Sequence, residues 1–194
     1  MRFLLSLFLV GLAAPLLAQS EPPVAEAGKP KTKLEAFVAQ DGVVIVRGFS
    51  KVGELKGQYG SSVEIESKEF TNASTGKKEY GITFEVKERS RLEREHTSYV
   101  DYDEIASLLK GLEYIAKVDK SATSFENFQA DYRTRGDLQI STYSTDGGTK
   151  TAAALTSGTI GKTTAFLALS DLDTLRSLIE AALATIDKSR GATK

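Results

Sequence analysis

The segment Gly161-Lys162-Thr163-Thr164 has the form in which a phosphate-binding loop, G-x-x-x-x-G-K-[ST], ends. In such a loop, backbone amides wrap the phosphates, and the N-terminus of the following helix receives them. Here Thr156 stands where the first glycine belongs, and β-branched and aromatic residues follow Lys162. Because such residues favour strands, we interpret the segment as a turn that leads into a strand, and we expect no nucleotide cofactor.

His96 is the only histidine, and the chain contains no cysteine. These counts exclude a zinc site built from several histidines or thiolates, and they exclude a cysteine nucleophile. A Ser-His-Asp triad would have to use His96. Because Arg94 and Glu95 precede it in an alternating segment, we predict that His96 is a solvated residue at the edge of a strand.

Carboxylates are abundant, and two of them could act as the acid and base of a glycoside hydrolase. The visible clusters have simpler interpretations, however. Five carboxylates lie where the N-terminus of a predicted helix favours negative charge: Asp101, Asp103, Glu104, Asp171 and Asp173. Glu64 and Glu66 alternate with apolar residues and are expected on the outward face of a predicted strand. The sequence therefore predicts no catalytic, cofactor-binding or metal-ligating residue.

Two other charged segments have structural interpretations. Arg135-Gly136-Asp137 matches the tripeptide by which some proteins bind integrins, but Gly-Asp between two predicted strands is typical of a turn. The segment 87–95, KERSRLERE, is dense in charge of mixed sign. Such charges are typical of a solvated hairpin tip or strand edge, where they discourage pairing between molecules.

Residues 1–18 have the pattern of a cleaved secretory signal, in which Arg2 precedes an apolar run from Phe3 to Leu12. The run is too short to cross a bilayer as a helix, which needs about 20 residues. Lipid attachment would need a cysteine at the cleavage point, and there is none. We therefore predict cleavage near Ala18 and a secreted or periplasmic protein with no stable membrane anchor.

The rest of the chain divides by composition. Residues 19–33 contain three of the four prolines and few apolar residues, so we predict a disordered linker. We predict a single globular domain at 34–188 and a flexible tail at 189–194. Alternating or continuous apolar residues predict strands at 43–46, 62–70, 79–88 and 96–100, and again at 125–135, 137–143, 151–158 and 162–169. The run at 43–46 is typical of a strand that is covered on both faces.

Helical spacing of apolar residues follows each group of four strands. The first predicted helix spans 102–117, with Asp101 and Glu104 as a capping box and Asp103 as the alternative cap. The second spans 170–188, with Ser170 as its cap and Asp173 at the third position. Their apolar stripes are Leu108, Leu112 and Ile115, and Leu172, Leu175, Ile179, Leu183 and Ile186.

The two halves, 34–118 and 124–188, thus have the same order of four strands and a helix. We predict an α+β fold of two antiparallel four-stranded sheet units, each followed by a helix, with the helices packing in a shared core. This order resembles the whirly-type single-stranded DNA-binding fold over roughly residues 40 to 188. The resemblance implies sheets that radiate from a helical core, but no DNA-binding motif of that family matches residue by residue.

The charge balance is near neutral, with 25 basic and 26 acidic residues and no run of one sign. We therefore do not expect binding to nucleic acid or to an anionic membrane. Without a catalytic signature, the sequence favours an exported, non-catalytic binding or structural module whose partner is a protein or a small ligand. Two alternatives stay open: a hydrolase with a carboxylate pair, and single-stranded nucleic-acid binding as the resemblance implies.

Overall fold

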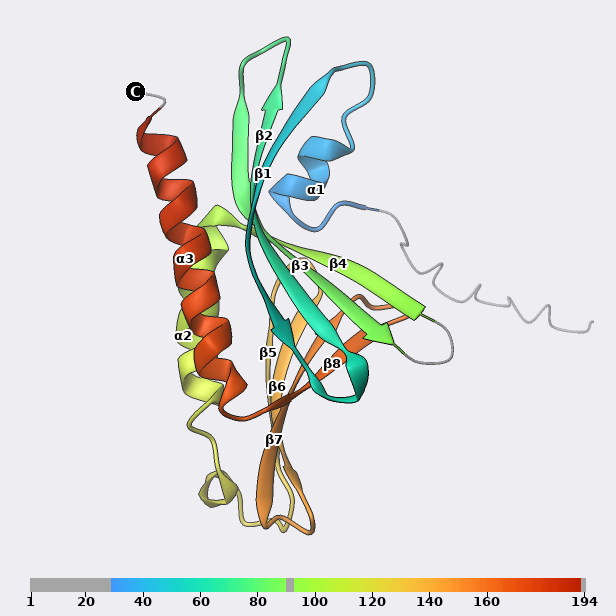
Figure 1. Cartoon of the computed structure of the whole chain (residues 1–194), viewed down its shortest axis with the longest axis vertical. Helices are drawn as coiled ribbons and strands as arrows, with labels where there is room; N and C mark the ends of the chain where they lie inside the picture. Colours follow the sequence, from blue (N-terminus) through green and yellow to red (C-terminus); the bar gives the residue numbers. More distant parts are fainter. Residues whose placement is uncertain (1–28, 90–92, 193–194) are drawn as a thin grey trace, which may run out of the picture.

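The computed structural model describes residues 29–89 and 93–192. The predicted signal peptide and most of the predicted linker lie outside these residues. Figure 1 shows the order of the elements along the described chain. The strands are β1 (Ile45–Lys56), β2 (Ser62–Asn72), β3 (Lys78–Arg89), β4 (Glu93–Asp101), β5 (Gln129–Arg133), β6 (Leu138–Thr145), β7 (Lys150–Ser157) and β8 (Thr163–Ala168). The helices are α1 (Lys33–Val38), α2 (Ile105–Ile115) and α3 (Asp171–Gly191), with the 3₁₀ turns η1 (Gln58–Gly60), η2 (Tyr102–Glu104) and η3 (Lys120–Ala122).

The described strands form two antiparallel sheets of four strands each. The N-terminal sheet has the order β1-β2-β3-β4 and the C-terminal sheet the order β5-β6-β7-β8, so neighbours in a sheet are also neighbours in the sequence. The helix α2 follows the first sheet, and α3 follows the second. This arrangement confirms the predicted α+β class and the repeated order of four strands and a helix.

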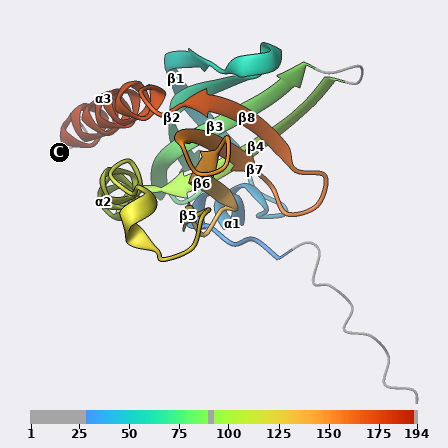
Figure 2. The ribbon, with the colours of Figure 1, turned by 90° about the horizontal axis from the view of Figure 1, so that it is seen from below.

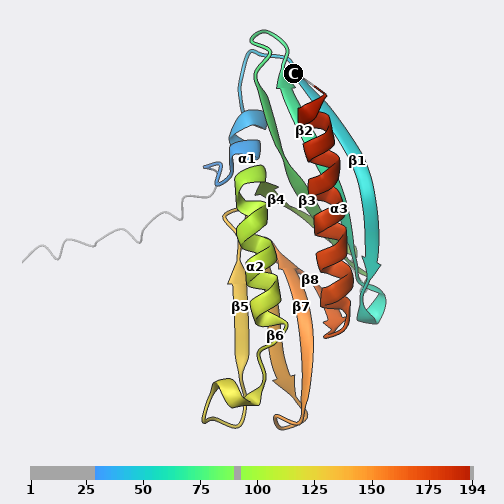
Figure 3. The ribbon, with the colours of Figure 1, turned by 90° about the vertical axis from the view of Figure 1, so that its left-hand side faces the viewer.

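The helices α2 and α3 lie side by side on one side of the molecule and run in opposite directions (Figure 2, Figure 3). Their predicted apolar stripes are buried, including Leu112 of α2 and Ile179 of α3. One difference concerns α3, where Ala182 is buried and Leu183 is only half-buried. Within the described residues, no helix is both long enough and apolar enough to cross a membrane.

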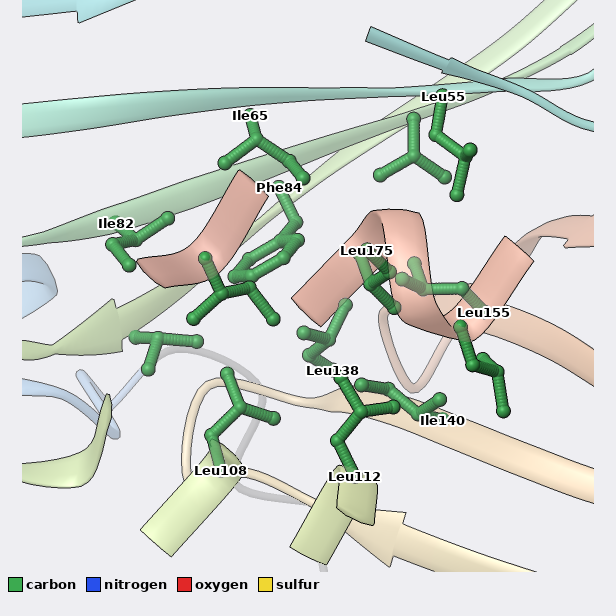
Figure 4. Close-up of a cluster of buried hydrophobic side chains, with 14 of the residues drawn as sticks. Leu55, Ile65, Ile82, Phe84, Leu108, Leu112, Leu138, Ile140, Leu155 and Leu175 are labelled. Atoms are coloured by element: carbon green, nitrogen blue, oxygen red, sulfur yellow. The ribbon is translucent and has the colours of Figure 1, made fainter. Parts of the chain in front are cut away.

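One hydrophobic cluster joins both helices to both sheets. Figure 4 shows Leu108 and Leu112 of α2 beside Leu138 and Ile140 of the C-terminal sheet, with Leu175 of α3 above them. Each such side chain contributes roughly 1.5–3 kcal/mol when it is fully buried. The helices therefore pack in a shared core, as the sequence predicts.

The strand β1 differs from its prediction. It begins at Ile45, extends far beyond residue 46 to Lys56, and lies at the edge of its sheet. Val44 and Val46 are 67% and 56% exposed, so the prediction of a strand covered on both faces is wrong. The register shifts between Lys51 and Gly53. Such a bulge changes which side chains share a face. The alternation of residues along β1 is therefore interrupted, and the full length of the strand is not evident from the sequence.

The helix α1 was not predicted from the sequence. It is too short for a periodic signal and packs on the N-terminal sheet through Leu34 and Phe37. A capping box between Thr32 and Glu35 fixes its first turn. Because Thr32 is buried, the last residues of the predicted linker belong to the folded domain. At the other end, α3 continues to Gly191, beyond the predicted boundary at 188.

Ser170 is the N-cap residue of α3, and Asp101 is that of η2, which leads into α2. Neither side chain makes a capping hydrogen bond, so the predicted capping contacts are wrong. The carboxylate of Asp101 instead accepts hydrogen bonds from the backbone N–H groups of Lys33 and Leu34, at 2.9 and 3.0 Å, in the first turn of α1. Glu104 accepts a hydrogen bond from the backbone N–H of Arg135 at 2.8 Å. Both carboxylates thus bind segments that are remote in the sequence.

Candidate functional site

The GKTT segment forms a turn and the start of β8. Gly161 has a φ of +65°, which favours glycine, and Thr163 is the first residue of the strand. The next helix, α3, begins at Asp171. A strand therefore stands where a phosphate loop needs the N-terminus of a helix, and Lys162 is an exposed residue that precedes this strand.

His96 connects the two sheets. Its Nδ1 on β4 lies 2.8 Å from the Oγ of Ser157 on β7, and Ser157 Oγ lies 2.6 Å from the Oγ of Ser98 on β4. Gly158 approaches the imidazole so closely that a Cβ there would lie 2.9 Å from two ring atoms. His96 is half-buried, so the prediction of a solvated residue is wrong. The edge strand β4 is covered here by the second sheet, which the sequence does not show.

Serine and histidine are two of the three residue types of a catalytic triad, but Ser157 is inaccessible to a substrate. Ser157 is 0% exposed and Ser98 is 1% exposed, so a substrate carbonyl cannot reach either hydroxyl. The hydrogen bonds that join His96, Ser157 and Ser98 therefore satisfy buried polar groups between the sheets. Beside them, His96 lines a depression of about 480 Å³ together with Lys31 and Asp137, and Lys31 and Asp137 form an ion pair at 2.6 Å.

The carboxylates before α2 bind Arg135. Its Nε donates to Glu104 Oε2 at 3.2 Å, and its Nη2 donates to Asp103 Oδ1 at 3.0 Å. Lys33 Nζ also donates to Asp103, at 3.0 Å. The Lys33 hydrogen bond, with Arg135 adding to it, holds the pKa of Asp103 below its ordinary value despite partial burial. Because Arg135 and Asp137 are both in ion pairs, the RGD tripeptide is part of the folded framework.

The outward carboxylates of β2 are ion-paired as well. Glu64 accepts a hydrogen bond from Lys51 Nζ at 2.7 Å, and Glu66 pairs with Lys68. Across residues 29–89 and 93–192, no group of three or more His, Asp or Glu side chains is placed to hold a metal ion. The carboxylates of β2 thus lie in ion pairs with lysines of the same sheet.

The C-terminal sheet has one face in the core and one face outside it. Leu138, Ile140 and Leu155 point into the core, so the residues that alternate with them point away. We call this second surface the outer face. Most residues at its two margins are exposed, including Asp131 of β5 and Phe166 of β8. The residues between them in the same row, Ser141 and Ala154, are buried. The strand register places three rows across it, Arg133-Gln139-Thr156-Thr164, Asp131-Ser141-Ala154-Phe166 and Gln129-Tyr143-Ala152-Ala168.

A polar network fixes the carboxylate of Asp131 on the outer face. Its Oδ1 accepts hydrogen bonds from Ser141 Oγ at 2.6 Å, Gln129 Nε2 at 2.9 Å and Gln139 Nε2 at 3.0 Å. Arg133 donates to Gln139 Oε1 at 2.5 Å. Burial acts to raise the pKa of Asp131, but the hydrogen bonds from Ser141, Gln129 and Gln139 outweigh it and hold the pKa below its ordinary value. Asp131 is therefore ionised at neutral pH and accepts hydrogen bonds only.

The rings of Tyr59 and Phe166 lie at the other margin of the outer face, and the ring of Tyr143 on β6 lies between the two margins. Tyr59 of η1 and Phe166 make a T-shaped contact, with ring centroids 5.9 Å apart and planes at 81°. Burial raises the pKa of the Tyr143 phenol, and the neighbouring Tyr59 phenol adds to that rise. Tyr59 is 81% exposed and Phe166 is 39% exposed. The rings of Tyr59 and Phe166 thus form an exposed apolar surface, and Tyr143 is half-buried.

The backbone of Tyr59 is in the left-handed region, with φ 57° and ψ 26°. This conformation is uncommon for a residue other than glycine, and residues held in it cluster at functional sites. Here it accompanies an aromatic ring that lies mostly in solvent. The outer face therefore combines exposed rings, a strained backbone position and a fixed polar network.

None of the outer-face residues is predicted from the sequence as a binding residue. The alternation of Gln139, Ser141 and Tyr143 with buried Leu138 and Ile140 is a signal that these three share a face. The sequence contains no comparable signal for Tyr59, which precedes a glycine in a connecting turn.

Comparisons of the chain with protein-family models, with curated proteins and with solved structures find no match. A functional proposal for this protein therefore depends on the geometry of the described residues. The outer face is the strongest candidate because its aromatic rings and its polar network lie on one surface.

Proposed function

We propose that this protein is an exported, non-catalytic binding protein that receives its ligand on the outer face of the C-terminal sheet. The observation that supports this most is the exposed ring of Tyr59, which a left-handed backbone holds against Phe166. Exposed apolar surface that is rimmed by polar residues is typical of interaction sites. The support for export is the signal-like pattern of residues 1–18.

The polar part of the outer face suits binding because it is already ordered. Ser141 is buried and Gln139 is half-buried, and both donate to Asp131. A ligand that contacts these groups does not have to immobilise them first. Preorganised groups lower the entropic cost of association.

The two alternative functions have weaker support. A glycoside hydrolase needs two carboxyl groups about 5–10 Å apart, and the network around Asp131 is built from amides, a hydroxyl and a guanidinium. The resemblance to the whirly-type fold stays a prediction. We do not extend it to nucleic-acid binding, because an ionised Asp131 disfavours the approach of phosphates.

The binding proposal can be tested by amide NMR on the full chain. The probes are neutral hexasaccharides, uncharged hexapeptides and single-stranded hexanucleotides. We expect at least one probe to shift signals from residues 129–133, 139–143 and 164–168. Shifts confined to other surfaces, or no shifts with any probe, would contradict the proposal.

Matched variants separate the outer face from exposed aromatic surface in general. Tyr59→Ala removes the ring beside Phe166, whereas Tyr114→Ala removes a ring of α2 that is 73% exposed. Both tyrosines are exposed, so both variants should stay folded, since surface changes usually alter stability by less than about 0.5 kcal/mol. We expect only Tyr59→Ala to weaken binding.

A further inference from the structure

We propose further that the ligand of the outer face is an uncharged oligosaccharide, an inference that rests on the proposed binding function. Three properties of the outer face point to this chemistry. They are its charge balance, the type of hydrogen-bonding groups that it presents, and the separation between its polar and aromatic parts.

The three rows of the outer face contain one charge of each sign. Asp131 and Arg133 lie within them, and Lys162 and Asp137 lie near the end of the row that begins with Arg133. Asp137 is ion-paired with Lys31, so Lys162 adds one cation beside these rows. A polyanion such as a nucleic acid gains affinity from several unpaired cations. The outer face offers no such excess, so it suits an uncharged ligand.

The polar groups of the outer face suit a ligand rich in hydroxyl groups. Three of the four hydrogen bonds to Asp131 end on Oδ1, and Oδ2 has one longer contact, at 3.2 Å from Gln129. A carboxylate has about four acceptor positions, so Oδ2 retains capacity for a donor. The Thr156 and Thr164 hydroxyls, 3.0 Å apart, lie farther along the first row. Sugar hydroxyls both donate and accept, and can therefore bind all of these groups.

The aromatic rings suit the apolar faces of sugar rings. A pyranose ring presents C–H groups with a partial positive charge on its faces, and aromatic rings have a negative face. Tyr59 is 81% exposed, so most of its ring lies in solvent beside Phe166. Stacking on such a ring requires no charge on the ligand.

The separation of the two parts indicates a chain of sugars. Asp131 on β5 and Phe166 on β8 occupy the same row, three strand spacings apart. At about 4.8 Å for each spacing, this is roughly 14 Å. Small residues, including Ala154, lie between them. A single sugar cannot contact both margins, whereas several linked sugars can.

The test is calorimetric titration of the full chain with four linear hexasaccharides, made of β-1,4-linked glucose, β-1,4-linked N-acetylglucosamine, β-1,4-linked mannose and α-1,4-linked glucose. We expect at least one to bind, and its monosaccharide to bind at least about tenfold more weakly. Tyr59→Ala and Asp131→Asn should each weaken binding by about tenfold. Tyr114→Ala should bind as the wild type does, and melting curves should show that all variants are folded.

The possible negative results distinguish the proposal of an oligosaccharide ligand from the proposal that the outer face is a binding site. If no hexasaccharide binds but an uncharged hexapeptide or a single-stranded hexanucleotide does, and Tyr59→Ala abolishes that binding, the sugar proposal fails and the binding face stands. A hexasaccharide whose affinity is unchanged in both Tyr59→Ala and Phe166→Ala overturns the proposed site. If no probe binds and no outer-face signal shifts, both proposals fail.

Discussion

Thr163 allows a direct test of the buried polar contacts between the sheets. Its side chain is 0% exposed and lies opposite Ser157 in the register of β7 and β8. Within the described part of the chain, its Oγ1 makes no hydrogen bond. A buried hydroxyl without a partner costs about 1–3 kcal/mol. Valine has nearly the same shape without the hydroxyl, so we expect Thr163→Val to raise the free energy of unfolding by about 1 kcal/mol.

Thr142 on β6 is the matched control. It is also 0% exposed, but its Oγ1 donates to the backbone carbonyl of Ile115 at 2.9 Å. Thr142→Val removes this hydrogen bond at the end of α2, and we expect a loss of about 1–2 kcal/mol. Both changes put valine in a strand of the same sheet. Opposite signs would therefore report the hydrogen bond and not a general effect of valine.

Urea unfolding monitored by circular dichroism measures both effects as changes in the midpoint at a constant slope. Thermal melting is a second readout, in which 1 kcal/mol corresponds to about 2–4 °C for a protein of this size. If Thr163→Val destabilises the protein as much as Thr142→Val does, the Thr163 hydroxyl has a partner in solution. That result would refute the reasoning.

Three other predictions concern the core, the acidic cluster and the GKTT turn. Leu112→Ala and Ile179→Ala should each lower the free energy of unfolding by roughly 2–5 kcal/mol, because both side chains are buried in the shared core; losses below about 0.5 kcal/mol in urea titrations would contradict that core. The folded-state pKa of Asp103 lies below its ordinary value of 3.8 because of Lys33, so its contribution to stability should be present above that value and lost as the pH falls through the folded-state pKa. Acid titrations of the wild type and Asp103→Asn should therefore converge at low pH, and a constant difference would contradict the assignment. Lys162→Ala should change stability by less than about 0.5 kcal/mol, and millimolar ATP should not raise Tm; a rise of several degrees that the variant abolishes would favour a phosphate site.

The sequence by itself predicts the elements whose signals are local. The apolar residues of α2 and α3 recur every three or four positions, and this spacing fixes which side of each helix is buried. In β3, the alternation of Ile82, Phe84 and Val86 with polar residues does the same for a strand. These patterns were sufficient for the fold class and for the order of elements in both halves.

The elements that the sequence did not predict depend on contacts between distant segments. The helix α1 has two buried anchors, Leu34 and Phe37, and receives part of its N-terminal capping from Asp101. The exposure of β1 follows from its place at the sheet edge. His96 is covered because Ser157 of the other sheet packs against it. The residues of a single segment do not indicate which distant segments will pack against it.

The outer face shows the same limit for function. Composition excluded thiol and multi-histidine chemistry, and alternation in β6 placed Ser141 and Tyr143 on one side of a strand. Only the tertiary structure decided that this side faces away from the core, that Asp131 lies beside Ser141, and that Tyr59 meets Phe166. The physical reason is that a sheet register and a backbone conformation together determine which side chains meet. Both are set by the packing of the whole domain, whereas the period of a strand is set by its own residues.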